Sequence, residues 1–199
     1  MIVHLCQQRT EEWFALRCGK FTASNFDKLF MKPSTAGYQN LINTVVYERL
    51  TGDTPDSYSS EWMQRGNDLE GEALQRYELE TFNKTHLVGL VEMNEWIGCS
   101  PDALVGDDGL AQIKCPKHNT AIYYALNLQK AVEEFSSQMQ GELWITERKW
   151  NDLCIYHPKL EPLIIRVQRD ENTIECLKNE LAKAIEEAKQ RINKIKGIN

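Results

Sequence analysis

The chain has 199 residues, of which 42% are hydrophobic and 26% charged, and this balance predicts one globular domain over residues 1–199 with a sizeable core. Its net charge of −6 argues against unspecific adhesion to nucleic acid, but a local DNA-binding cleft stays possible. No apolar run is long enough to span a bilayer, and the first residues lack the hydrophobic stretch of a signal peptide. We therefore expect a cytoplasmic protein with no membrane partner.

The first 82 residues show the patterns of helices. Thr10 is a suitable cap for a helix with an acidic first turn that ends near Gly19. Apolar residues recur at helical spacing further on, as in the stripe of Leu41, Val45 and Leu50. Helices are therefore predicted over residues 10–19, from the Thr22–Ser24 corner onward, over 38–50 and over 61–82, with a loop at 51–60.

After residue 82 the pattern changes to short strands. Strands are predicted over residues 86–94, 95–100, 102–105 and 110–115, with a hairpin turn at the GDDG sequence of 106–109. Helices over 120–128 and 131–143, strands over 150–157 and 162–170, and a charged amphipathic helix over 172–196 complete the chain. This order predicts an α/β fold with a central mixed sheet flanked by helices.

The cysteines carry no metal-binding pattern. There are six of them, scattered along the chain, without a CxxC pair or a histidine at ligand spacing. Zinc is therefore not expected, and buried free thiols in a reducing compartment are the favoured interpretation.

A candidate active site lies in the hairpin CSPDALVGDDGLAQIKCP, residues 99–116. Because side chains alternate faces along a strand, Gln112 and Lys114 point the same way while Ile113 turns into the core, and Asp102 comes alongside them. Such oxygen ligands suit a hard cation such as magnesium, and a lysine is able to orient or help deprotonate a hydrolytic water. The alternative is a polar hairpin end with a solvated lysine, because the pattern alone is short and common.

This hairpin resembles the SPDG…E-(I/L)-K-C-P motif of the YqaJ-type and lambda-exonuclease-like family. Three further segments resemble motifs of that family, in the same order: EEWFALRCGKFTAS at 11–24, RGNDLEGEALQRY at 65–77 and FSSQMQGELWIT at 135–146. Each block alone is weak, but the combination over residues 13–146 is specific.

The resemblance implies a PD-(D/E)xK restriction-endonuclease-like core and a 5′→3′ exonuclease that acts on double-stranded DNA ends. Such an enzyme releases 5′-mononucleotides and leaves 3′ single-stranded overhangs for phage-type recombination. The resemblance also implies two Mg²⁺ ions per active site, with Mn²⁺ as a substitute, a homotrimeric ring, and a single-strand annealing protein as partner.

Residue by residue, the resemblance assigns roles at the metal site. Asp102 matches the bridging metal ligand, Lys114 the water-positioning base, and the carbonyl of Ile113 a further ligand. Glu70 matches a glutamate that supports the metals through their waters, and Gln138 matches a glutamine that orients groups near the scissile phosphate.

The resemblance also places Arg17, Ser24 and Ser100 in a pocket for the terminal 5′ phosphate. This assignment agrees with the chemistry, because an arginine offers a planar fork to phosphate oxygens and Ser24 stands at an expected helix start, where free backbone donors favour an anion. Taken singly, Arg17 fits a surface arginine equally well, and Ser24 fits a simple helix cap.

Gln112 stands where the family carries Glu. Glutamine keeps the shape and a carbonyl oxygen but loses the negative charge, so metal affinity and the alignment of the water should suffer. Either the site has decayed into an inactive DNA-end-binding protein, or a nearly isosteric Glu→Gln change was engineered into a working exonuclease. We favour the second explanation because every other matched position is intact, and we expect reduced or abolished activity. A restriction-type endonuclease of the same fold is a further alternative, which the 5′-phosphate pocket argues against.

Overall fold

A computed structural model describes the backbone of residues 1–55 and 61–197, and the side chains of all of these except residues 61–63. The N-terminal part comprises β1 (Ile2–His4), α1 (Glu11–Arg17), β2 (Phe21–Thr22), the 3₁₀ helix η1 (Ala23–Phe30), α2 (Ala36–Thr51) and α3 (Glu61–Thr81). The middle part comprises β3 (Thr85–His86), β4 (Leu90–Asn94), β5 (Ile97–Cys99), β6 (Ala103–Val105) and β7 (Gly109–Lys114). The last part comprises α4 (His118–Leu126), α5 (Leu128–Thr146), β8 (Trp150–Ile155), β9 (Leu163–Gln168) and α6 (Glu171–Lys196).

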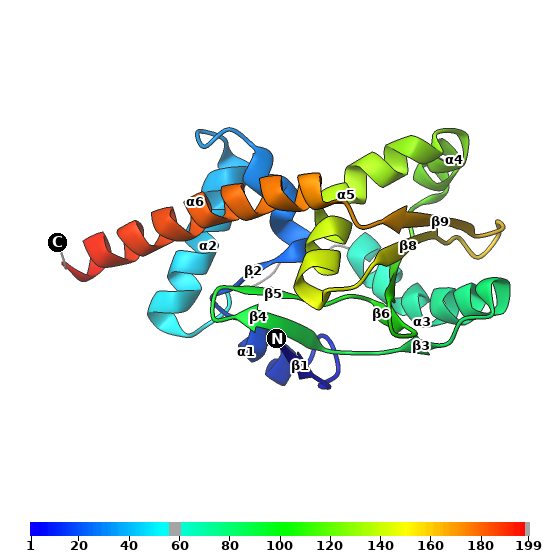
Figure 1. The fold of residues 1–199 in the computed structure, drawn as a ribbon, viewed down its shortest axis with the longest axis horizontal. Helices are drawn as coiled ribbons and strands as arrows, with labels where there is room; N and C mark the ends of the chain where they lie inside the picture. The colour runs from blue at the N-terminus through cyan, green and yellow to red at the C-terminus, as the bar shows by residue number, and fades with distance from the viewer. Residues whose placement is uncertain (56–60, 198–199) are drawn as a thin grey trace.

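These elements confirm the predicted α/β class with mixed sheets flanked by helices. The strands form two sheets, however, where the sequence predicted one: a four-stranded sheet in the order β1-β4-β5-β2 and a five-stranded sheet in the order β3-β6-β7-β8-β9. The parallel β7–β8 pair of the second sheet has antiparallel neighbours on both sides. Figure 1 shows the two sheets meeting in the middle of the molecule, with α6 running toward the C-terminus on the left and α3 on the right.

The division into two sheets has local causes. The predicted strand over 86–94 is split into β3 and β4 at Gly89, whose backbone N–H donates to the carbonyl of His4 at 2.9 Å. A Cβ on Gly89 would lie 2.4 Å from the carbonyl oxygen of Cys6, so a glycine is needed for this close approach. Between β5 and β6 the chain passes through Pro101, which lacks the N–H that a continuous ladder requires.

Three further details differ from the sequence-based expectation. The short strand β1 was not predicted, because three residues are too few to show an alternating pattern. The helix expected from the Thr22–Ser24 corner is a 3₁₀ helix. The loop predicted at 51–60 begins inside α2, which continues to Thr51, and its part at 56–60 lies outside the described residues.

The two sheets are covered by different helices. A large apolar cluster joins the four-stranded sheet to η1, α2, α5 and α6. The five-stranded sheet packs α3 on one face, through Ala73, Leu74 and Tyr77, and α4 with α5 on the other. Along β8, Cys154 faces α3 while Leu153 and Ile155 face α4 and α5, so the sheet is buried on both sides.

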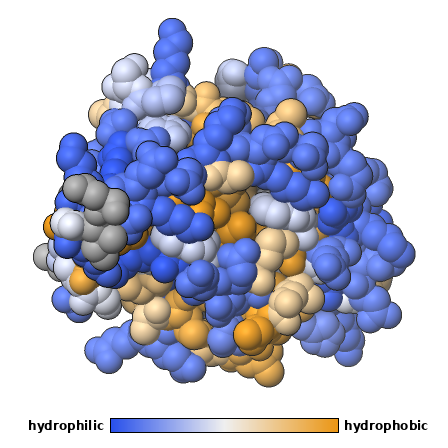
Figure 2. All heavy atoms as spheres, turned by 60° about the vertical axis from the view of Figure 1, so that its left-hand side comes forward, coloured by the Kyte–Doolittle hydropathy of each residue, from blue (hydrophilic) through white to orange (hydrophobic). Residues whose placement is uncertain are grey.

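All six cysteines are free, as predicted, but only Cys99 and Cys154 are buried; Cys176 is exposed and the other three are half-buried. Within the described residues, no helix combines the length and the apolar character that crossing a bilayer requires. On the face that Figure 2 shows, hydrophilic residues surround hydrophobic ones that gather near the centre and the lower edge.

Candidate active site

The carboxylate of Asp102 lies at the start of β6, beside two residues of β7. The antiparallel pairing that sets Ala103 opposite Ala111 brings Asp102 next to Gln112. Asp102 Oδ2 accepts hydrogen bonds from Gln112 Nε2 at 2.5 Å and from the Ile113 backbone N–H at 2.7 Å. The hairpin therefore holds the acid and the amide in direct contact, as the alternation of side chains predicted.

Gln138 of α5 connects the two polar side chains of β7. Its Oε1 accepts a hydrogen bond from Lys114 Nζ at 3.1 Å, and its Nε2 donates to Gln112 Oε1 at 2.8 Å. Gln112 and Lys114 thus face α5, whereas Ile113 is buried toward α3. The Lys114 ammonium also lies 4.8 Å from the centroid of the Phe135 ring, within the range of a cation–π contact.

The pKa of Asp102 is raised to about 6, chiefly because the carboxyl group is buried and secondarily because the charge of Glu70 is close. Lys114 and the Ile113 N–H act in the opposite direction. A cation bound beside Asp102 would favour the ionised carboxylate and lower this raised pKa.

Glu70 projects from α3 into the same region and accepts a hydrogen bond from Arg9 Nη2 at 2.5 Å. Arg9 has a positive φ of 68°, which is uncommon for a residue with a side chain. Arg9 was not predicted as a site residue, because it precedes the matched segments and its backbone conformation has no sequence signature.

Arg17 is surrounded by hydroxyl groups. Its Nη1 donates to Ser100 Oγ at 3.0 Å, and its Nη2 donates to Thr22 Oγ1 at 3.0 Å and Ser24 Oγ at 3.5 Å. The guanidinium lies 4.3 Å from the Trp13 ring centroid, and the indole N–H of Trp13 also donates to Ser100, at 3.0 Å. Burial lowers the pKa of Arg17 to about 10, so the group stays charged at neutral pH.

Two of these partners were not predicted as site residues. Thr22 and Trp13 both fall in the segment EEWFALRCGKFTAS, so their positions in that motif were an available signal. The structure argues against the alternative of a simple surface arginine, because the Arg17 guanidinium is enclosed by Trp13 and three hydroxyl groups.

Both clusters line one cavity of about 590 Å³. All nine side chains and backbone groups predicted for the site contribute to its wall: Arg17, Ser24, Glu70, Ser100, Asp102, Gln112, Ile113, Lys114 and Gln138. The fold thus brings together segments that lie more than a hundred residues apart in the sequence.

The oxygen donors of this cavity fit a hard divalent cation. The carboxylates of Asp102 and Glu70, the Gln112 amide oxygen and the Ile113 carbonyl are the ligand types that magnesium prefers. Among the described residues no three His, Cys, Asp or Glu side chains are grouped closely enough to hold a metal ion. At position 112 the group that faces Asp102 is the amide Nε2, while Oε1 accepts a hydrogen bond from Gln138, so this position supplies no acid beside Asp102.

A buried carboxylate that the sequence-based analysis missed lies next to this network. Glu142 is 1% exposed, and its Oε1 accepts a hydrogen bond from Gln138 Nε2 at 2.9 Å. Burial, with the charge of Asp102 as the second cause, raises the pKa of Glu142 to about 8. Its spacing of four residues from Gln138 on one helix was the available signal.

Comparisons with known proteins give matches in both sequence and fold. The model of the YqaJ-like viral recombinase domain matches residues 12–149. An alkaline exonuclease, LHK-Exo, from Laribacter hongkongensis is 35% identical with a TM-score of 0.86, and the match covers 94% of this chain and 96% of that one. A structure of LHK-Exo in complex with dAMP gives 36% identity and a TM-score of 0.87 over the same shares.

A phage-related exonuclease from Haemophilus somnus 129PT shares the fold, with 16% identity, a TM-score of 0.75, and coverage of 88% of this chain and 96% of that one. No curated protein matches the chain.

Proposed function

Since the chain belongs to the family of YqaJ-like viral recombinase domains, we propose that it is a metal-dependent exonuclease that degrades double-stranded DNA in the 5′→3′ direction. The observation that carries this proposal is the placement of two clusters in one cavity. Asp102, Gln112 and Lys114 form a hydrolytic cluster, and Arg17 with its hydroxyl partners forms an anion pocket. An enzyme that starts at a 5′ end needs both a reacting centre and a holder for the terminal phosphate.

The residues of the hydrolytic cluster have separate tasks in this proposal. Lys114 orients the attacking water and stabilises charge as it develops on the phosphate, and Gln138 fixes the direction of the lysine through its amide oxygen. Asp102, Gln112 Oε1 and the Ile113 carbonyl would hold divalent cations, with Glu70 supporting them. Two Mg²⁺ ions, or Mn²⁺ in their place, would polarise the phosphoryl group and supply the activated water.

Arg17, Ser24 and Ser100 hold the terminal 5′ phosphate in this proposal. A guanidinium that donates to hydroxyl groups is able to exchange them for phosphate oxygens, which are stronger acceptors. The product would then be a 5′-mononucleotide, and the dAMP complex of the similar LHK-Exo supports this choice. The remaining strand would carry a 3′ overhang.

The assembly and setting also belong to the proposal. A ring of three identical chains would retain the DNA by enclosing it, which suits a protein with a net charge of −6. We propose a cytoplasmic enzyme of phage-type recombination that passes its overhangs to a single-strand annealing protein. The free state of all six cysteines supports a reducing compartment.

Gln112 is the residue that supports a second candidate function, a protein that binds DNA ends without cutting them. Loss of the anionic ligand at this position lowers metal affinity, and a complete loss of turnover would leave a protein that binds DNA ends without cutting them.

A nuclease assay separates these possibilities. The chain, Gln112→Glu and the control Lys114→Met are given linear duplex labelled at either end, and closed circular duplex, each with magnesium. We expect mononucleotides from 5′ ends, an intact circle, a higher rate for Gln112→Glu, and a rate lower by about 10²–10⁴ for Lys114→Met. Cutting of the circle would establish an endonuclease. Inactivity of both the chain and Gln112→Glu, with both folded, would overturn the exonuclease and favour the end-binding protein.

A further inference from the structure

Near Asp102 in the candidate active site, an amide lies on strand β7 and a buried carboxylate lies on the facing helix α5. Position 112, which lies against Asp102, carries a neutral amide, while a buried carboxylate stands at position 142 on the facing helix. The two positions are bridged by one side chain, since Gln138 Nε2 donates both to Gln112 Oε1 at 2.8 Å and to Glu142 Oε1 at 2.9 Å. The amide and the carboxylate are therefore joined in one network.

Among the described residues, the side chains that donate hydrogen bonds to the Glu142 carboxylate are neutral amides. Besides Gln138, it accepts a hydrogen bond from Asn151 Nδ2, at 3.1 Å from Oε2. No ion pair within the described part of the chain involves Glu142, although the residue is 1% exposed. The charge of Lys114 favours the ionised form of Glu142 without forming an ion pair with it, so a cation bound beside Asp102 would add to this partial compensation.

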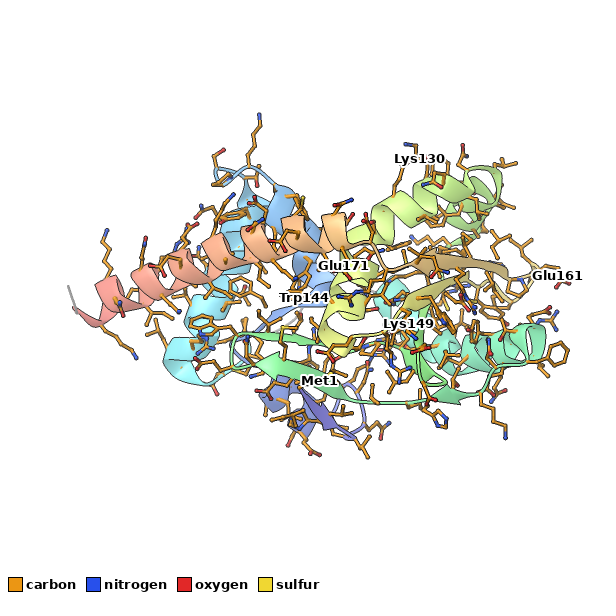
Figure 3. The ribbon with its side chains drawn as sticks, viewed as in Figure 1. Met1, Lys130, Trp144, Lys149, Glu161 and Glu171 are labelled. Atoms are coloured by element: carbon orange, nitrogen blue, oxygen red, sulfur yellow. The ribbon has the colours of Figure 1, made fainter. Side chains whose placement is uncertain are left out.

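The position of Glu142 excludes direct contact with a substrate in the cavity. It does not line the cavity, whereas Gln138 and Gln112 do, so its carboxylate is behind these two amides as seen from the cavity. Trp144, two residues further along α5, is half-buried, and in the view of Figure 3 it is labelled close to Glu171 at the start of α6. Glu142 therefore acts through its neighbours and does not touch a substrate in the cavity.

We propose that Glu142 is a positioning residue that supplies, through Gln138, the negative charge that the site lacks at position 112. The inference rests on the proposed function, because it concerns the metal site of that exonuclease. A pair of Gln112 and Glu142 has the same formal charge as Glu at 112 with a neutral residue at 142. The acid is thus displaced from the strand to the helix.

Two physical effects follow from this placement. Glu142 fixes the Nε2 side of the Gln138 amide, which directs Gln138 Oε1 toward Lys114. Its charge also acts over a short path of buried side chains, where a low dielectric makes attraction for a cation beside Asp102 stronger than in water. A cation beside Asp102 would in turn favour the ionised form of Glu142 over the protonated one.

The test compares isosteric variants that separate charge from shape. Glu142→Gln removes the charge and keeps an acceptor oxygen, and the swap Gln112→Glu with Glu142→Gln moves the charge to the strand. Glu133→Gln is the matched control, because Glu133 lies on the same helix, is exposed and forms an ion pair with Lys130. The readouts are Mn²⁺ affinity by titration calorimetry without DNA, and kcat and KM for nucleotide release.

We expect Glu142→Gln to weaken Mn²⁺ binding about 10–100-fold and to lower kcat with little change in KM for DNA, since outer partners of metal ligands have effects of this size. The swap should restore Mn²⁺ affinity to at least the original value, and Glu133→Gln should change nothing. A second variant, Glu142→Asp, keeps the charge and should bind Mn²⁺ more tightly than Glu142→Gln, which provides a test even if the glutamine variant unfolds.

Unchanged Mn²⁺ affinity in folded Glu142→Gln, or a swap that fails to rescue it, would overturn the inference and leave the exonuclease proposal intact. The converse failure is also recognisable. If Mn²⁺ affinities follow the expected order but neither the chain nor Gln112→Glu releases nucleotides, the exonuclease proposal fails and the role of Glu142 in cation binding stands.

Discussion

The carboxylates of Asp152 and Glu142 lie on opposite sides of the five-stranded sheet, and their hydrogen-bond partners differ in charge. On the α3 face, Asp152 of β8 is 2% exposed and accepts two hydrogen bonds from Arg166, at 2.8 and 2.9 Å, and one from the Tyr77 hydroxyl at 2.7 Å. On the α5 face, Glu142 is equally buried but accepts hydrogen bonds only from the amides of Gln138 and Asn151.

The difference distinguishes a structural charge from a functional one. Asp152 has its cation built into the neighbouring strand, so nothing further is needed to satisfy it. Within the described residues, no cation is hydrogen-bonded to the Glu142 carboxylate. The Arg17 guanidinium shows the opposite case, because within the same residues it has no ion pair with an acid and donates only to hydroxyl groups. Charged groups without a bonded counter-ion in a cavity are candidates for a function, which agrees with the proposal of a cation beside Asp102 and a terminal phosphate at Arg17.

The largest expected effect comes from removing the Asp152 carboxylate, which is paired with Arg166. Asp152→Ala should lower the free energy of unfolding by about 3–5 kcal/mol, because it leaves the Arg166 guanidinium and the Tyr77 hydroxyl without their acceptor. Urea unfolding measures the change. At pH 8 the matched variant Glu142→Gln should cost little or even stabilise the metal-free protein, since it removes an uncompensated buried acid. Equal destabilisation by the two variants would remove the distinction between the faces.

Arg17 gives the next largest effect. If its guanidinium is kept free for a terminal phosphate, Arg17→Ala should remove about 1.5–3 kcal/mol of preference for 5′-phosphorylated over 5′-hydroxyl duplex. The ratio of the two digestion rates measures this preference. Arg76→Ala, which changes an exposed arginine already paired with Glu80 and Glu161, serves as the control. A preference that survives in Arg17→Ala would take this residue out of the pocket.

Glu142 should also affect how the stability of the metal-free protein depends on pH. The pKa of Glu142 is raised to about 8, so between about pH 4.5 and 8 the folded state holds a proton that the unfolded state has lost. Metal-free stability should therefore fall as pH rises through this window, by at most about 1.4 kcal/mol per pH unit for one proton. Thermal unfolding of the chain and of Glu142→Gln at pH 5 to 8 should show a steeper fall for the chain. Parallel curves would contradict the raised pKa.

An exposed pair supplies the smallest effect. Asp108 Oδ2 lies 2.8 Å from Lys149 Nζ, and both side chains are at least half exposed. Asp108→Ala should change the free energy of unfolding by less than about 1 kcal/mol, because solvent screens the pair. Urea unfolding at low and high salt checks this value. A loss as large as that of Asp152→Ala would show that burial is not what separates the two kinds of pair.

The sequence predicted the parts of this site that short motifs encode. Alternation along β7 placed Gln112 and Lys114 together, and the hairpin placed Asp102 beside them. The contacts of Arg9 with Glu70 and of Glu142 with Gln138 were not predictable in the same way, because they depend on how α3 and α5 are packed against the sheet. The division into two sheets escaped prediction for a similar reason, since it arises from a close approach of Gly89 to Cys6.

Anomalous diffraction from crystals soaked in Mn²⁺ tests the central claim most directly, because it locates the cation whose attraction to the uncompensated acid is at issue. We expect a peak about 2.0–2.5 Å from an Asp102 carboxylate oxygen, next to the side chain of Gln112, and a weaker peak in Glu142→Gln at the same Mn²⁺ concentration. No peak beside Asp102, or peaks of equal occupancy in both proteins, would contradict the account.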